Sequence, residues 1–278
     1  MVEVRLLAMS PRLEGLVEEL PPNRARRAVE LVAYLALHHP DVVTSDRLRT
    51  RVLGSSDCDA AAKTLFNTAY AARRAMGVDA HGNPLFPAAS RNGLYRVSPE
   101  VTVDVQRAID LVEAAKTSGF QDRAIAGYCG ALGLVDGEPL ANALAGYTWW
   151  ETEGHAGRIG AVLVDAACAL AALAPERGLF DLALWGLEQA RVVAPYSEAL
   201  SRAAMELAAA EGDAERLRLE WRTCQRMVDA LDPGASPSPS TESLYGELSR
   251  RVLVASNERE PVRRYAPAAS DCTSVADP

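Results

Sequence analysis

The chain has 278 residues, of which 49% are hydrophobic and 24% charged, and its formal net charge is −8. This composition is typical of a soluble globular protein and excludes a collagen, a wholly disordered chain and a small disulfide-rich scaffold. The longest apolar runs, such as 166–174, are about half the ~20 residues of a membrane span, and residues 1–5 do not open a secretory signal. We therefore expect a cytoplasmic protein without membrane contact.

Charge is distributed unevenly along the chain. Residues 1–104 carry 13 Lys and Arg against 12 Asp and Glu, a net charge of +1, whereas residues 105–278 carry 16 against 25, a net charge of −9. Proteins that bind nucleic acid usually show a basic domain or a basic stripe. DNA contact by the first part would thus need a local patch, and the acidic second part is better suited to protein.

The N-terminal residues 1–104 predict a winged helix-turn-helix domain. Residues 2–20 alternate in polarity like strands, with a second short run at 16–20, and helices are predicted at 24–38, 46–53 and 60–76. Asn92-Gly93 is a strong hairpin signal, which pairs 85–86 with 94–97. Two strands, three helices and a hairpin, in this order, are typical of a winged helix.

The remainder of the chain reads as helices with Gly and Pro between them. The predicted helices span 104–118, 121–135, 149–173, 179–193, 196–211, 213–231 and 241–254. Gly178 and Gly212 lie 34 residues apart, which is the tetratricopeptide period. We predict a mainly α protein in which an all-α, tetratricopeptide-like domain occupies 105–254, and residues 255–278 form a disordered tail.

These segments resemble a known family, the actinobacterial antibiotic regulatory proteins, which join a winged helix to a bacterial transcriptional activator domain. The residues that carry the resemblance are 33–38, 43–48, 63–65, 72–77, 93–96, 103–104, 195–200, 212–213, 232–238 and Tyr245. The resemblance covers about residues 2–252 and implies a transcription regulator that binds DNA. This chain departs from the family at Ala71, where a further cation is usual.

The third predicted helix separates into two faces. At 100° per residue, Leu65, Ala69, Ala72 and Met76 form an apolar stripe. The opposite face holds two cations, an amide and a phenol, side chains that bond phosphates or base edges: Lys63, Asn67, Tyr70 and Arg74. This face is predicted to contact double-stranded DNA, although an ordinary solvated helix face would have the same pattern.

Two further groups are candidate DNA contacts. Arg24, Arg26 and Arg27 open the first helix, where an anion is favoured, or they serve solubility and pair with Glu18 or Glu19. Arg91 and Asn92 at the predicted wing tip suit a phosphate or minor-groove contact, or form a generic polar turn.

No catalytic, cofactor or metal site is predicted. The four His and five Cys show no HxH, HxxxH or CxxC pair, and neither GxxxxGK[ST] nor GxGxxG occurs. His155 follows Glu151 by one helical turn, but no nucleophile completes a catalytic set, so we assign it a structural role. The four Trp, at 149, 150, 185 and 221, are expected to pack between helices, an aromatic ligand cage being the alternative.

Two functions follow from these patterns. The first is a DNA-binding and protein-interaction module of transcription-regulator type, which forms a homodimer through its helical half or binds another protein there. The alternative is a scaffold that does not bind DNA, the cytosolic end of a larger signalling protein, membrane-anchored or not, with a degenerate winged helix. The order of elements favours the first, whereas Ala71 and the nearly neutral N-terminal charge favour the second.

Overall fold

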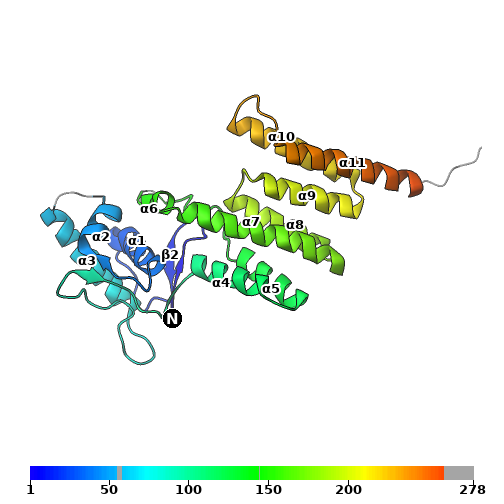
Figure 1. The fold of residues 1–278 in the computed structure, drawn as a ribbon. Helices are drawn as coiled ribbons and strands as arrows, with labels where there is room; N and C mark the ends of the chain where they lie inside the picture. The colour runs from blue at the N-terminus through cyan, green and yellow to red at the C-terminus, as the bar shows by residue number, and fades with distance from the viewer. Residues whose placement is uncertain (55–57, 144, 260–278) are drawn as a thin grey trace, which may run out of the picture.

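The computed structural model describes residues 1–54, 58–143 and 145–259, and it confirms a mainly α protein with two parts. A small winged-helix half is followed by a stack of helices that extends away from it (Figure 1). The predicted tail at 260–278 lies outside the described residues. Residues 255–259, which were predicted to belong to it, continue the last helix.

Within residues 1–54 and 58–103, which the structure describes, the winged-helix half contains three helices and five short strands. Their bounds are β1 (Val2–Arg5), β2 (Arg12–Glu14), α1 (Pro22–Leu37), β3 (Val43–Thr44), α2 (Ser45–Arg51), α3 (Cys58–Met76), β4 (Leu94–Tyr95) and β5 (Val101–Val103). Helix α1 is the centre of this half, because residues 28–36 are all buried, and it packs against α3, β1 and β5. Pro22 suits the first turn of α1, where an amide proton would have no partner.

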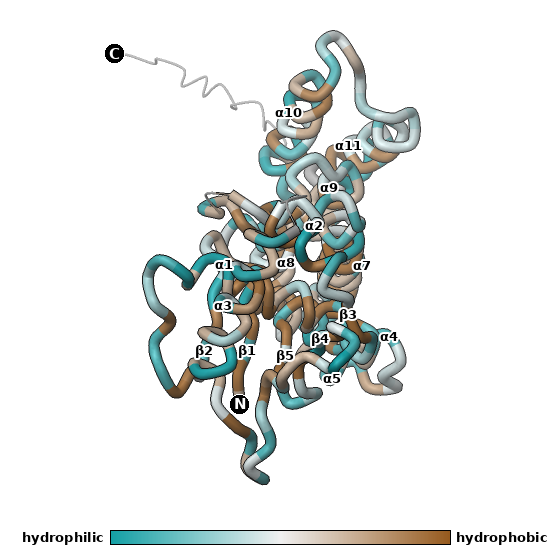
Figure 2. The backbone as a smooth tube through the Cα atoms, turned by 90° about the vertical axis from the view of Figure 1, so that its left-hand side faces the viewer, coloured by the Kyte–Doolittle hydropathy of each residue, from teal (hydrophilic) through white to brown (hydrophobic). Residues whose placement is uncertain are grey.

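The first sheet has the strand order β2-β1-β5 and differs in one strand from the prediction. β1 pairs antiparallel with β2 and parallel with β5, with Val4 opposite Leu13 and Val103. The predicted second strand at 16–20 is wrong, since the strand lies at Arg12–Glu14 and the chain turns at Gly15 with a φ of 77°. In Figure 2, β1 and β5 are among the hydrophobic segments at the centre of the molecule.

The predicted hairpin between 85–86 and 94–97 is also wrong. β4 pairs with β3, with Tyr95 opposite Val43, to form a separate two-stranded sheet. Leu85 and Phe86 are buried, but the Leu85 amide donates to the Gly77 carbonyl and its carbonyl accepts from the Ser98 amide. The apolar pair is therefore a buried loop whose backbone groups find partners outside a strand ladder.

The helical half stacks consecutive helices in antiparallel pairs. The bounds are α4 (Asp104–Lys116), α5 (Gln121–Leu132), α6 (Thr148–Thr152), α7 (His155–Leu173), the 3-10 helix η1 (Ala174–Arg177), α8 (Phe180–Val193), α9 (Glu198–Glu211), α10 (Ala214–Leu231) and α11 (Pro239–Arg259). The neighbours α4 and α5, α7 and α8, and α9 and α10 pack side by side, as helical repeats do. The helix predicted at 149–173 is two helices, because Gly154 has a φ of 76° and interrupts it.

Helix α7 is the core helix of this half. Together with η1, residues 155–177 are long and apolar enough to cross a membrane by length and composition, and among the described residues no other helix is. Ile159, Leu163 and Leu170 are fully buried, and α7 packs against α4, α5, α8 and α9. Its apolar character is thus used for packing between helices.

One hydrophobic core continues from the winged-helix half into the helical stack as far as α9. A smaller cluster around Met205, Leu217 and Leu248 joins α9, α10 and α11. The boundary predicted near 104 falls where β5 passes directly into α4. The segment after β1 also bonds to the loop after α5, with the Asp136 amide donating to the Leu7 carbonyl at 2.6 Å. These contacts fix α3 relative to the helical stack.

Candidate nucleic-acid interface

Helix α3 has the two faces that its sequence predicts. Leu65, Ala69, Ala72 and Met76 are 2% exposed or less, which confirms the buried stripe. On the other side, Lys63, Tyr70 and Arg74 are exposed and Asn67 is half-buried. Helix α3 therefore presents two cations, an amide and a phenol to solvent, side chains that can reach a phosphate or a base edge.

The exposed face of α3 also contains an aromatic residue that the sequence analysis missed. Phe66 is 65% exposed and lies one turn before Tyr70, which is 48% exposed. At 100° per residue, Phe66 is about 60° from Lys63, so the same helical projection could have identified it. An exposed apolar ring beside cations can contact a thymine methyl group in the major groove.

The C-terminal end of the face is occupied by an ion pair. Arg74 donates from Nη2 to a carboxylate oxygen of Glu18 at 2.7 Å, and both side chains are about half exposed. This hydrogen bond and the charge of Glu18 raise the pKa of Arg74 above its ordinary value. The neighbouring Arg73 instead donates to the carbonyls of Phe86 and Pro87, which holds the buried loop. A phosphate would compete with Glu18 for Arg74.

The three arginines at the start of α1 do not act as one group. Arg26 donates from Nη1 to the Ala145 carbonyl of the helical half at 2.7 Å and lies 3.8 Å from the buried carboxylate of Glu30. Arg27 is exposed, and Arg24 is half-buried. The predicted alternative partner of these arginines, Glu18, instead pairs with Arg74.

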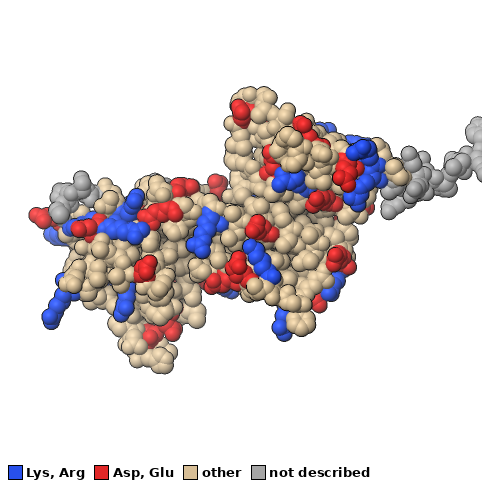
Figure 3. Space-filling model, viewed as in Figure 1, with Lys and Arg blue, Asp and Glu red and all other residues tan. Residues whose placement is uncertain are grey.

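Arg91 and Asn92 lie exposed in the turn before β4, where the wing was predicted. The turn closes when the Gly93 amide donates to the Ser90 carbonyl at 2.9 Å, and Gly93 has a φ of 69° that a side chain would disfavour. Cations and anions are interspersed over the face of this half seen in Figure 3. The face of this half seen in Figure 3 is thus not continuously basic.

A polar network lies where the two halves meet, and we call His38, Arg47, Glu153 and His155 the junction cluster. Glu153 Oε1 accepts from the Tyr34 hydroxyl at 2.9 Å, and Oε2 lies 3.1 Å from both His38 Nε2 and Arg47 Nη2. Arg51 lies 3.4 Å from Oε1. Two cations of α2 that could have faced DNA therefore point to the helical half.

The electrostatics of the junction cluster follow from burial and these contacts. Partial burial acts to raise the pKa of Glu153, but the Tyr34 hydrogen bond and the charge of Arg47 outweigh it and lower this pKa. Burial and the Glu153 hydrogen bond raise the pKa of Tyr34 to about 12. Burial, followed by the neighbouring His38, lowers the pKa of His155.

His155 lies where the two halves of the molecule meet. It begins α7, whereas Glu151 is exposed on α6, so the two residues do not lie one turn apart on a single helix. Its Nε2 is instead 4.0 Å from Glu153 Oε2. Its ring stacks on Trp150 at 6.0 Å between centroids, and Trp149 and Trp150 are buried. As predicted, these two tryptophans pack between elements.

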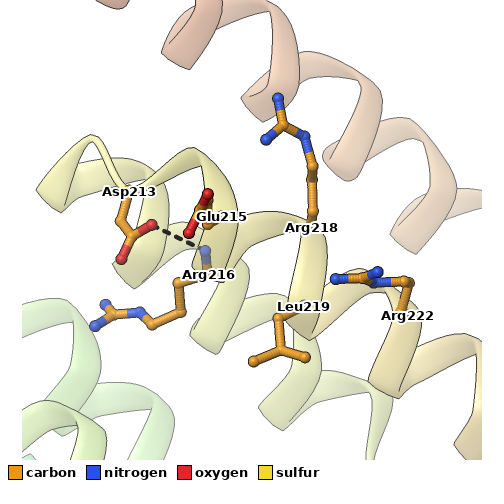
Figure 4. Close-up of a pocket in the computed structure, with 6 residues that line it drawn as sticks. All are labelled: Asp213, Glu215, Arg216, Arg218, Leu219 and Arg222. Atoms are coloured by element: carbon orange, nitrogen blue, oxygen red, sulfur yellow. Dashed lines mark hydrogen bonds between the residues drawn. The ribbon is translucent and has the colours of Figure 1, made fainter.

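A second polar surface lies on α10, at the far end of the stack. Arg218 and Arg222 extend from this helix one turn apart, beside Leu219 (Figure 4). All three side chains are exposed, Leu219 to 50%. The helix starts at a cap in which Asp213 accepts from the Arg216 amide at 2.9 Å. Guanidinium groups beside an apolar side chain suit an acidic protein partner.

Comparison with known proteins identifies the fold. No family model and no curated protein sequence matches the chain. Among solved structures, it is similar to Mycobacterium tuberculosis EmbR in complex with a low-affinity phosphopeptide, with a TM-score of 0.66 and 20% sequence identity. The similarity covers 92% of this chain and 68% of the EmbR chain. The protein therefore has the EmbR fold, a winged helix joined to a stack of helical repeats.

Proposed function

We propose that the chain is a cytoplasmic module of transcription-regulator type, in which the winged helix binds double-stranded DNA and the helical half binds protein. The observation that carries the proposal is the exposed face of α3, where Lys63, Phe66, Tyr70 and Arg74 stand opposite a fully buried stripe. Arg91 and Asn92 would add wing contacts.

The likeness to EmbR supports the protein-interaction part of the proposal. EmbR, which this chain matches over 68% of its length, is in complex with a phosphopeptide in that structure and so binds another polypeptide. In the present chain, the exposed Arg218, Leu219 and Arg222 on α10 provide one candidate surface. Self-association through α10 and α11 is a second proposed interaction of the helical half, since both helices expose apolar side chains such as Leu231 and Leu253.

The competing function is an interaction scaffold that does not bind DNA. It is favoured by the internal use of basic side chains, since Arg26, Arg47, Arg51 and Arg74 all contact groups of the protein itself. The N-terminal half also has a net charge of only +1 over residues 1–104. The two functions differ in a single measurable property, which is affinity for duplex DNA.

Fluorescence anisotropy with a pool of random duplexes, followed across a salt series, tests the proposal. We expect binding that weakens steeply with salt, because phosphate contacts release counterions. Lys63→Ala and Arg74→Ala should each weaken binding and lower the salt slope by roughly one if the side chain bonds a phosphate. Arg123→Ala is the matched control, an exposed cation on α5 in the helical half. Absence of duplex binding by the wild type would support the scaffold, whereas equal binding by all variants would exclude Lys63 and Arg74 as the DNA contacts.

A further inference from the structure

Three metal-ligating side chains from both halves of the molecule meet in the junction cluster. We propose that this cluster is a site for one divalent transition-metal ion of the zinc type, held by His38 Nε2, His155 Nε2 and a carboxylate oxygen of Glu153. These three ligand atoms all lie within 4.8 Å of one another. Two imidazoles and a carboxylate are a common zinc donor set, with metal–ligand distances of about 2.0–2.2 Å. Small side-chain rotations would bring the atoms to that spacing.

A hydrogen bond to the backbone orients the His38 ring as a metal ligand. Its Nδ1 lies 2.7 Å from the Tyr34 carbonyl oxygen. A carbonyl can only accept, so Nδ1 carries the proton and Nε2 presents its lone pair to Glu153 when the ring is neutral. Metal-binding histidines commonly donate their second ring nitrogen to a carbonyl in this way, which fixes the tautomer and the ring orientation.

The cluster is arranged around a positive charge. His38 Nε2 and Glu153 Oε2 are 3.1 Å apart, and with neutral His38 both present lone pairs, so the pair requires a cation beside it. Arg47 Nη2 supplies one, at 2.9 Å from the nitrogen and 3.1 Å from the oxygen. The buried His155 Nε2, however, has no hydrogen-bond partner among the residues that the structure describes. Arg47 thus satisfies two of the three ligand atoms, whereas a metal ion would satisfy all three.

The Arg47 side chain can move away from the cluster when a metal ion binds. Its side chain is 48% exposed, in contrast to 15% for Glu153, so the guanidinium can turn into solvent. On the inner side, His155 stacks on Trp150 and packs edge-on against Trp149, which holds the ring at the cluster. The bound ion would link the residue that follows α1 to the residue that follows α6 and to the first residue of α7. Arg47 is therefore a competitor of the metal rather than a ligand.

The test uses the full chain, reduced and freed of metal with a chelator, and titrates Zn²⁺ by calorimetry. We expect one ion per chain. His155→Phe keeps the stacked ring but removes the ligand, and should abolish the tight binding. His39→Phe is the matched control, because His39 is exposed beside His38, and it should bind like the wild type. Arg47→Ala should bind Zn²⁺ more tightly than the wild type, since it lacks the competing cation.

Co²⁺ absorption distinguishes this site from cysteine binding elsewhere in the chain. A site built from nitrogen and oxygen ligands gives visible bands without a thiolate charge-transfer band. The proposal is overturned if the wild type fails to bind one ion, if a thiolate band appears at the first equivalent, or if His155→Phe binds as well as His39→Phe. Circular dichroism checks that His155→Phe folds. If His155→Phe does not fold, the Zn²⁺ affinity of Arg47→Ala tests the proposal instead. Affinity equal to or weaker than that of the wild type overturns the proposal.

Discussion

The two carboxylate oxygens of Asp104, the first residue of α4, share the backbone N–H of Leu6 in a bifurcated hydrogen bond, at 2.9 and 2.8 Å. They also accept from the amides of Leu7 and Val105. A fully buried side chain at the start of the helical half therefore caps the end of β1 in the winged-helix half. It satisfies backbone donors that the sheet leaves without strand partners.

Removal of this side chain should destabilise the whole molecule. Asp104→Ala leaves the three amide groups buried without acceptors, and each such group costs about 1–3 kcal/mol. We expect the free energy of unfolding to fall by about 3 kcal/mol or more, measured by urea denaturation. Asp110→Ala, an exposed carboxylate on the same helix, is the control and should change it by no more than about 0.5 kcal/mol.

The same residue makes stability depend on pH. Burial raises the pKa of Asp104 to about 6, above its ordinary value of 3.8. The folded state thus holds this proton more tightly than the unfolded state, so the contribution of Asp104 to stability falls as the pH rises from about 4 to about 6. The difference in free energy of unfolding between wild type and Asp104→Asn, measured by denaturation across this range, should therefore fall as the pH rises. Parallel pH profiles for the two proteins would contradict the assignment.

Two adjacent residues of α3 should separate folding from binding. Leu65→Ala removes a buried side chain and should lower the free energy of unfolding by roughly 2–5 kcal/mol. Phe66→Ala changes an exposed side chain, so stability should move by about 0.5 kcal/mol or less while duplex affinity decreases. Thermal melting together with anisotropy measures both properties. A large loss of stability in Phe66→Ala would place that ring in the core instead.

Release of Arg74 from its ion pair should strengthen DNA binding. Glu18→Gln removes the negative charge that a phosphate must replace, and it also reduces repulsion of the duplex. We expect tighter binding at low salt, with little change in melting temperature because exposed ion pairs contribute about 0–1 kcal/mol. In Arg74→Ala the same substitution should have a smaller effect. Equal effects in both backgrounds would show that the pair does not limit binding.

Self-association is predicted through the helical half. Light scattering should give twice the monomer mass at micromolar concentrations, and Leu253→Asp on the exposed side of α11 should return the monomer. A monomer at every concentration would contradict the prediction, whereas a dimer that persists in Leu253→Asp would place the interface elsewhere.

The sequence predicted most helices because their apolar residues recur at helical spacing. The stripe from Leu65 to Met76 is an example, since the periodicity alone fixes which side is buried. The pair Leu85-Phe86 has no such period. Two apolar residues look the same in a strand and in a buried loop, and the actual partner of β4 is a strand of only two residues, Val43–Thr44.

The candidate DNA face could be predicted in part, and the junction cluster not at all. The residues exposed on α3 follow from one helical projection, but their ion pairs do not, because Glu18 and Arg74 are 56 positions apart. His38 and Glu153 are separated by 115 positions, so no local spacing indicates that they meet. Contacts of this kind arise only when the two halves pack together.

For the proposed binding of DNA, the continuous core between the halves has a consequence for the spacing of DNA half-sites. Because hydrophobic packing continues from β1 to α9, the helical stack holds a fixed position relative to the winged-helix half and does not act as a flexible linker. In a dimer joined at α10 and α11, the distance between the two α3 helices would be set by the length of two stacks. Spacers that differ by half a turn of DNA would then present the second half-site on the wrong side of the duplex.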